Sequence, residues 1–199
     1  MLNLSNRYHK GSRIKTNKTH TVFMIKVINI ETPLGEMIAG ATRDGICLLE
    51  FIDRRPDSDL LKPIAKIMGS EVKGGSNKHL RSLKKQLREY FRGKRKEFTV
   101  SLITPGTDFQ QAVWKNLLNI PFGTTLSYGE QARNLKNIKS ARAVAQANSS
   151  NRIAIVIPCH RIIGSDGSLV GYRGGLERKK WLLNHERKFS GKAVDLNLF

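Results

Sequence analysis

The stretch "IAIVIPCHRIIGSDGSLVGYRGGLERKKWLLNHE", residues 153–186, joins an apolar run to a group of reactive and charged side chains. Five apolar residues lead to Pro158, which cannot donate a hydrogen bond to a β-ladder. We therefore expect a buried strand over 153–157 that breaks at the edge of a cleft. A thiol, an imidazole and a guanidinium follow at residues 159–161, so the stretch predicts a reactive site at this break.

The thiol at Cys159 is a candidate nucleophile. Thiolate is the reactive form, and a neighbouring imidazole or guanidinium lowers a thiol pKa from about 8.5 toward neutrality. His160 and Arg161 could both do this. Adjacent side chains of an extended chain point to opposite sides, so His160 would reach the sulfur through a turn or a bridging water. The other cysteine, Cys47 in "GICLLEF", is interpreted as a buried structural residue.

A catalytic base needs an orienting partner, and Glu186 is the candidate. The last helix, "LERKKWLLNHE", has the apolar Trp181, Leu182 and Leu183 to hold one side and Glu186 near its C-terminal end. A carboxylate there opposes the helix dipole, which suggests a purpose, although a solvated surface glutamate would give the same pattern. The preceding "GYRGG" lacks the spacing of a phosphate loop and is interpreted as a turn that lets another group approach closely.

Composition points to a polyanionic partner. The chain has 199 residues with 35 Lys and Arg against 16 Asp and Glu, a formal charge of +19, which favours nucleic acid ahead of a membrane surface. No apolar run approaches the roughly 20 residues that cross a bilayer. Two cysteines are too few for a disulfide framework or a four-cysteine zinc cluster, so a reducing compartment fits best.

The N-terminal half predicts a small sheet with a helix. Residues 1–23 contain no acids and are expected to form a disordered basic arm; an organellar transit peptide, or a true start at Met24, would look the same. From there "MIKVINIETPLGEMIAGATRDGICLLEFI" holds two or three strand-like runs joined by turn signals, typical of an antiparallel sheet. An amphipathic helix over 77–92, capped by Asn77, and a last strand over 93–103 complete a domain at 24–104.

The C-terminal half, 105–187, predicts a mostly helical domain followed by a tail at 188–199. Its first helix, "TDFQQAVWKNLLNI", is capped by Thr107 or Asp108. Next, Ser127 and Glu130 of "SYGEQARNL" form a capping box, and a second short helix, "IKSARAVAQAN", follows. Two short helices and a high positive charge favour a helix-turn-helix, although an ordinary helical hairpin has the same pattern. The fold class is therefore α+β in two small domains.

These motifs resemble one family. "IPCHRIIGSDGSLVGYRGGLERKKWLLNHE", with "SYGE", "SARAVAQAN" and "TPLGEMIAGATRDGICLLEF", is similar to the O6-alkylguanine-DNA alkyltransferases, also called methylated-DNA-protein-cysteine methyltransferases. The similarity runs from about Met24 to Glu186. It implies a ribonuclease H-like N-terminal domain, an antiparallel sheet with a helix, and a C-terminal domain with a helix-turn-helix.

The resemblance implies a DNA-repair protein that reacts once. A damaged guanine is flipped out of the duplex, and Cys159 takes the alkyl group from its O6 oxygen in one irreversible displacement. His160 deprotonates Cys159 through a water, and Glu186 orients His160. Displacement at an alkyl carbon by a thiolate requires neither metal nor cofactor, so we expect none.

The resemblance also assigns DNA-binding and pocket residues. Tyr128 lies beside the target base and its 3′ phosphate, and Arg142 fills the gap left in the stack. Asn151 is the hinge between recognition helix and active site. The loop lining the alkyl pocket contains Tyr172, Arg173 and Gly174. The partner is duplex DNA with O6-alkylguanine, bound in the minor groove without sequence preference by a monomer with no membrane contact. The location is cytoplasmic and nucleoid-associated in a prokaryote, or nuclear in a eukaryote.

Three residues depart from the family pattern: Arg152 follows Asn151 where proline is common, Arg173 stands at a position often small, and Gln131 replaces an apolar residue. Arg173 puts tolerance of bulky alkyl groups in doubt.

Two other functions are open: a non-catalytic alkyltransferase-like lesion binder, against which Cys159 argues, and a thiol hydrolase with a Cys-His-Glu triad.

Overall fold

A computed structural model describes residues 23–53, 56–135 and 140–191. Contacts divide the chain into two units, one running to Glu89 and including Phe98–Pro105, the other made of Tyr90–Glu97 and the chain from Gly106. Most of the expected basic arm and the end of the expected tail lie outside the described residues.

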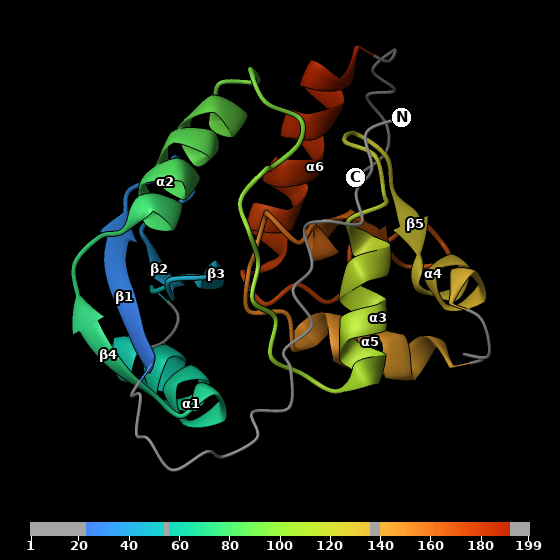
Figure 1. Cartoon of the computed structure of the whole chain (residues 1–199). Coiled ribbons are helices and arrows are strands. Elements are labelled where there is room, and N and C mark those ends of the chain that lie inside the picture. The colour runs from blue at the N-terminus through green and yellow to red at the C-terminus, as the bar shows by residue number, and fades with distance from the viewer. Residues whose placement is uncertain (1–22, 54–55, 136–139, 192–199) are drawn as a thin grey trace. The chain divides into compact units, whose positions relative to one another are not determined.

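The N-terminal unit is built on a four-stranded sheet in the order β3-β2-β1-β4 (Figure 1). Strands β1 (Phe23–Ile30), β2 (Met37–Ala41) and β3 (Ile46–Phe51) form an antiparallel meander, as expected from the sequence. Strand β4 (Ser70–Gly74) was not expected, and it pairs parallel to β1. This strand is short, polar and largely exposed at the sheet edge, so the sequence carries no apolar alternation to reveal it.

Helix α1 (Asp57–Met68) connects β3 to β4 and was also not expected. Pro63 lies inside this helix, and a proline in a helical pattern is ordinarily a sign that the helix has ended. The buried faces of α1 and the sheet form one apolar cluster: Ile25, Ile38, Cys47, Leu48, Leu60 and Ile64. Cys47 is 1% exposed, and burial raises the pKa of its thiol to about 12, so it is a structural residue as interpreted from the sequence.

Helix α2 (Lys78–Phe91) begins where the sequence predicts. The Asn77 side chain accepts hydrogen bonds from the backbone amides of His79 and Leu80, each at 3.0 Å, which satisfies two of the unpaired donors of the first turn. The last strand expected over 93–103 is wrong. Leu102 makes a single bridge to Ile46, and the rest of that segment is irregular.

The C-terminal unit contains four helices among its described residues: α3 (Asp108–Leu117), α4 (Tyr128–Asn134), α5 (Ala141–Ser149) and α6 (Leu176–Ser190). Capping boxes start α3 at Thr107, one of the two caps expected from the sequence, and α4 at Ser127, where the sequence predicts a box. Strands β5 (Leu126–Ser127) and β6 (Ile162–Ile163) form a short parallel pair.

Helices α4 and α5 form the expected helix pair, and residues 136–139 between them lie outside the described chain. The Ser140 hydroxyl caps α5 by accepting a hydrogen bond from the amide of Ala143 at 3.2 Å. The indole of Trp114 on α3 donates to the carbonyl of Ala147 on α5 at 2.8 Å. A buried tryptophan with its donor satisfied fixes α5 against α3.

The buried strand expected over 153–157 is wrong. This segment is a buried turn closed by a hydrogen bond from the amide of Ile157 to the carbonyl of Ile153 at 3.0 Å, and Ile155 has a φ of 69°. The chain then enters the 3-10 turn η2 (Cys159–Arg161). An apolar run correctly indicates burial but does not fix the backbone conformation, because periodicity cannot separate a short buried strand from other buried segments.

Candidate active site

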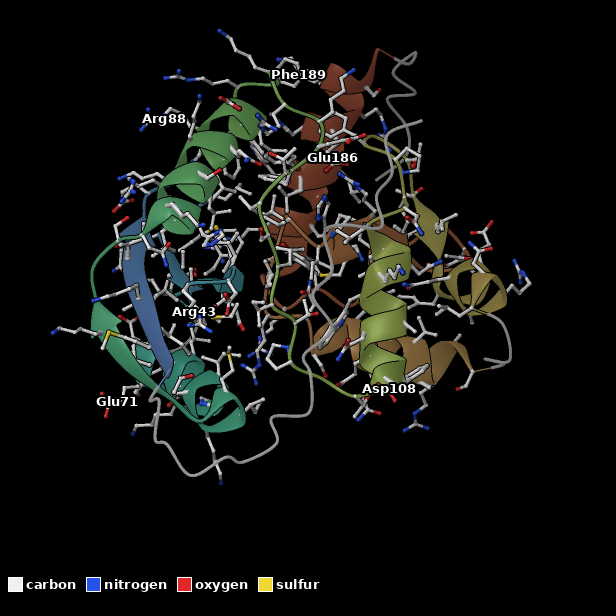
Figure 2. The ribbon with its side chains drawn as sticks, in the orientation of Figure 1. Arg43, Glu71, Arg88, Asp108, Glu186 and Phe189 are labelled. Carbon is white, nitrogen blue, oxygen red and sulfur yellow. The ribbon has the colours of Figure 1, made fainter. Side chains whose placement is uncertain are left out.

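Glu186 lies on α6 (Figure 2). Its hydrogen bonds make it the centre of a buried polar cluster. Its side chain is 0% exposed, which excludes the alternative of a solvated surface residue. Its Oε1 atom lies 2.9 Å from His160 Nε2, and Arg161 donates to both carboxylate oxygens, from Nε at 2.8 Å and from Nη2 at 2.9 Å. The turn η2 therefore directs two consecutive side chains at one carboxylate.

Two further donors complete the shell of Glu186. The hydroxyl of Tyr90, at the end of α2, donates to Oε1 at 2.9 Å, and the backbone amide of Gly123 donates to Oε2 at 3.1 Å. Burial would by itself raise the pKa of Glu186, but the charges and hydrogen bonds of His160 and Arg161 outweigh it and hold the pKa well below the ordinary value. Glu186 is therefore ionised.

His160 is a neutral base in this arrangement. Burial lowers its pKa, and the favourable charge of Glu186 does not fully offset that effect. Because an ionised carboxylate only accepts hydrogen bonds, Nε2 must carry the proton and Nδ1 must hold the lone pair. Nδ1 is buried and has no hydrogen-bond partner among the described residues. The ring is thus fixed with an unused acceptor in the residue next to Cys159.

Asn151 holds the thiol of Cys159, which is 8% exposed. Its Nδ2 donates to Cys159 Sγ at 3.3 Å and to the carbonyl of Ile157 at 2.9 Å, while its Oδ1 accepts from the amide of Ile153 at 3.0 Å. These backbone partners fix which way the amide faces, so a donor rather than an acceptor meets the sulfur. Asn151 therefore joins the residues after α5 to the thiol.

Arg161 does not take the role that its position next to the thiol suggested. Its guanidinium is used on Glu186 and on the carbonyl of Ile120, to which Nη1 donates at 2.6 Å. It therefore fixes the charge and position of Glu186, and only through that residue the orientation of His160. A bidentate arginine cannot be assigned from sequence spacing, because its partner is 25 residues away along the chain.

The loop after β6 approaches the same cluster. The ring of Tyr172 meets the ring of His160 edge-on, with centroids 6.3 Å apart, and the Tyr172 hydroxyl is buried without a partner among the described residues. The Tyr128 hydroxyl donates to the carbonyl of Gly171 at 3.3 Å. Burial raises the pKa of Tyr128, and the electrostatic effect of the nearby Cys159 raises it further by a smaller amount. The first turn of α4 thus reaches this loop.

Arg173 and Gly174 tie the loop to two helices. Arg173 Nη1 lies 3.4 Å from the carbonyl of Ser149 at the end of α5, and the carbonyl of Gly174 accepts from Arg178 Nη1 at 3.1 Å. Arg142 differs from the other expected residues, because it is exposed on α5 and is not part of the buried cluster.

Lys179 belongs to the site and was missed from the sequence. It is 0% exposed, and its ammonium donates to the carbonyls of Ile162, just after η2, and Val170, in the loop. Burial lowers its pKa to about 8. A signal was present: Lys179 falls on the same face of α6 as Leu182, Leu183 and Glu186, so a lysine occupies the buried stripe.

Among the described residues, no group of three or more His, Cys, Asp and Glu side chains could hold a metal ion. Within the same part of the chain, none of the helices has the length and apolar character to cross a membrane.

Each half of the chain matches one domain of a single family, and the chain belongs to the 6-O-methylguanine DNA methyltransferase family. The model of that family's ribonuclease-like domain matches residues 25–104, and the model of its DNA binding domain matches residues 108–188. The sequence-based resemblance and fold class are confirmed.

Among individual relatives, the chain is 39% identical over 156 residues to the methylated-DNA--protein-cysteine methyltransferase of Methanosarcina acetivorans, covering 78% of this chain and 94% of that protein. It is 54% identical over 114 residues to the protein of that name from Mycobacterium bovis, covering 57% and 68%. A crystal structure of Mycobacterium tuberculosis OGT in complex with DNA is similar with a TM-score of 0.69 and 37% identity, covering 83% of this chain and 94% of the other.

Proposed function

We propose that Cys159 is the alkyl acceptor in direct repair of O6-alkylguanine in duplex DNA. The observation that carries the proposal is the neutral His160, whose Nε2 is held by the ionised Glu186 and whose buried Nδ1 has no partner among the described residues. Such an imidazole can take the thiol proton, directly or through one water. Glu186 and Arg161 act on His160 rather than on the substrate.

The reaction is a single displacement. The Cys159 sulfur forms a bond to the alkyl carbon while the bond from that carbon to O6 of guanine breaks, and the electron pair leaves with the guanine, which takes up a proton. The product on the protein is a thioether, which has no ready leaving group. Each molecule therefore reacts once.

For DNA recognition we propose that α4 and α5 act as a helix-turn-helix in the minor groove, without sequence preference. The exposed Arg142 would enter the stack in place of the flipped base, and Tyr128 would lie beside that base. Small side chains on α5, at Ala141, Ala143 and Ala145, would permit close approach to the groove. The relative solved in complex with DNA supports the DNA-binding part of this proposal.

The loop that holds Tyr172, Arg173 and Gly174 is proposed as the wall of the alkyl pocket, with Asn151 as the hinge. The hydrogen bond from Arg173 to the carbonyl of Ser149 holds the Arg173 side chain beside α5. In that position Arg173 would limit the size of the alkyl group that the pocket accepts. We also propose the domain limits 24–104 and 105–187, near those of the two family models, and action as a monomer. The location would be at the nucleoid in a prokaryotic cytoplasm, or in a eukaryotic nucleus.

The test is incubation of the protein with a duplex that contains O6-methylguanine, followed by mass analysis of its peptides. We expect one methyl group on the Cys159 peptide, no further product after one equivalent, and an unmodified Cys47 as the internal control. Absence of any adduct would favour a non-catalytic lesion binder. Continued turnover would favour the hydrolase.

A further inference from the structure

The outer face of α2 has a single charge sign. All of the residues of this helix that are exposed are Lys or Arg: Lys78, Arg81, Lys84, Lys85 and Arg88. We call these five residues the α2 basic row. Figure 2 shows Arg88 projecting outward from the helix. All five lie in the N-terminal unit, whereas α4 and α5 belong to the other unit.

The fold does not require this row. Helix α2 is held by its apolar face, where Leu80, Leu83 and Leu87 are at most 1% exposed, and by the Asn77 cap. Solubility requires polar side chains on the outer face, but a mixture of both signs serves that need equally well.

The row is also electrostatically unfavourable for the isolated protein. Each member has at least one other member three or four residues away, so they are neighbours on the helix surface and repel one another. The first turn has no acidic residue, and Lys78 and Arg81 oppose the positive end of the helix dipole. Within the described part of the chain, none of the five is in an ion pair. A partner that brings negative charge would relieve each of these costs.

We propose that the α2 basic row binds the phosphate backbone of duplex DNA, as a second contact surface besides helices α4 and α5. From Lys78 to Arg88 the row extends about 15 Å at 1.5 Å per residue, and B-DNA has about one charge per 1.7 Å of its axis. Contacts of this kind do not read sequence, which suits a protein that must search long stretches of undamaged DNA.

Other partners fit the row less well. A membrane-surface helix needs an exposed apolar face, and the apolar face of α2 is buried inside the protein. A protein interface needs aromatic or aliphatic anchors at its centre, and the exposed residues of α2 are all cationic. The class of partner that fits the row is therefore a linear polyanion with closely spaced charges. DNA is such a polyanion, and the matching family model is that of a DNA binding domain.

The experiment compares two triple variants that remove the same charge. Arg81→Gln, Lys85→Gln and Arg88→Gln neutralise the row, whereas Lys62→Gln, Lys66→Gln and Lys73→Gln neutralise exposed lysines on α1 and β4. The affinity for an undamaged duplex is measured over a range of salt concentrations. The row variant should bind roughly tenfold or more weakly at low salt, and its log-log salt slope should be shallower by about 2.7, at about 0.9 per lost contact.

The control variant should keep the wild-type slope. Equal losses in the two variants would mean that only net charge matters, and an unchanged slope in the row variant would also overturn the proposal. Transfer from free O6-benzylguanine should be the same in all three proteins, which reports that the site is intact independently of DNA. If the triple variant fails to fold, Lys85→Gln alone should reduce the slope by about 0.9. A variant that keeps the positive charge, Arg81→Lys with Arg88→Lys, should keep the wild-type salt slope.

Discussion

Gln131 and Asn148 are hydrogen-bonded to each other in the interior of the helix pair: Asn148 Nδ2 donates to Gln131 Oε1 at 2.7 Å. Gln131 is 0% exposed and Asn148 is 6% exposed. Gln131 Nε2 also lies 3.4 Å from the carbonyl of Val113 on α3. Gln131, which stands where the family pattern has an apolar residue, therefore has a polar partner on α5. The pair links α4, which carries Tyr128, to α5, which carries Arg142.

This pair predicts a non-additive effect on stability. Gln131→Ala or Asn148→Ala alone should lower the free energy of unfolding by about 1–3 kcal/mol, because each leaves a buried amide without its partner. The double variant with Gln131→Ala and Asn148→Ala should cost less than the sum of the two single changes, because the second change no longer leaves an amide without its partner. Urea unfolding of the four proteins checks this. Additive losses would show that the two amides are not coupled.

The Glu186 carboxylate should matter for both stability and transfer. Glu186→Gln leaves the buried Arg161 without a counter-charge, which should cost about 3–5 kcal/mol of unfolding free energy. His160 also loses the anion that fixes its proton on Nε2, so transfer to Cys159 should slow at saturating DNA. Rapid-quench kinetics and urea unfolding measure the two effects. Glu177→Gln, an exposed change on the same helix, should alter neither, and equal behaviour of the two variants would contradict the role given to Glu186.

His160 should make the protein less stable in mild acid. Burial lowers its pKa in the folded protein, whereas in the unfolded chain it titrates near about 6.5, so the unfolded state binds more protons as pH falls. Stability present above about pH 6.5 should therefore decrease below it, with Glu186, whose folded pKa is also lowered, adding a further loss below about pH 4.3. His185, whose pKa burial lowers as well, contributes in the same range as His160.

Unfolding free energies at a series of pH values test this dependence. His160→Asn should flatten the decrease between about pH 6.5 and 5.5 without removing the part due to His185. An identical profile in wild type and His160→Asn would mean that His160 is not held neutral by the fold.

Lys179 should position the loop that follows β6. Lys179→Met removes the donor shared by the carbonyls of Ile162 and Val170, so residues 164–175 should keep only their other attachments, such as the bond from Arg178 to the carbonyl of Gly174. Hydrogen exchange of this loop should become faster, and transfer should become slower. Lys180→Met, an exposed neighbour on α6, should change neither. A variant that transfers normally with a loosened loop would show that the loop is not part of the reaction.

Arg142 can be tested with two substrates. If it holds the flipped state of the duplex, Arg142→Ala should lose much of its rate on methylated duplex but react almost normally with free O6-benzylguanine, which needs no flipping. If it only contacts a phosphate, saturating DNA should restore the rate. Equal losses on both substrates would indicate damage to α5 and would remove the assignment.

Helix ends and the residue types of the site could be predicted from the sequence, because both depend on short-range chemistry. The caps at Asn77, Thr107 and Ser127 depend on side chains that bond within three residues, and the structure has all of them. Strand β4 and helix α1 could not be predicted, since one is a polar edge strand and the other contains Pro63. Strand β4 depends on pairing with β1 and helix α1 on packing against the sheet, and local patterns contain neither.

The same limit applies to the site. Cys159, His160 and Glu186 could be nominated from their types and spacing; the structure bonds His160 to Glu186 and places Cys159 in the same turn as His160. The roles of Arg161, Tyr90 and Gly123 around Glu186 depend on contacts between segments far apart in the sequence. Asn151 was expected as a hinge, but the sequence does not show that its Nδ2 donates to the sulfur of Cys159, because that contact depends on the folded backbone.

Ile155 has a backbone conformation that β-branched residues rarely adopt, at a cost of about 1–3 kcal/mol, and it lies four residues before the thiol. Its side chain is 1% exposed, so packing forces the main chain to remain in this shape. An enzyme with many turnovers must open to release product each cycle, and rigidity there limits its speed. A protein that reacts once has no such cycle, so the same rigidity carries no kinetic penalty and can keep the thiol aligned through a long wait for a rare lesion.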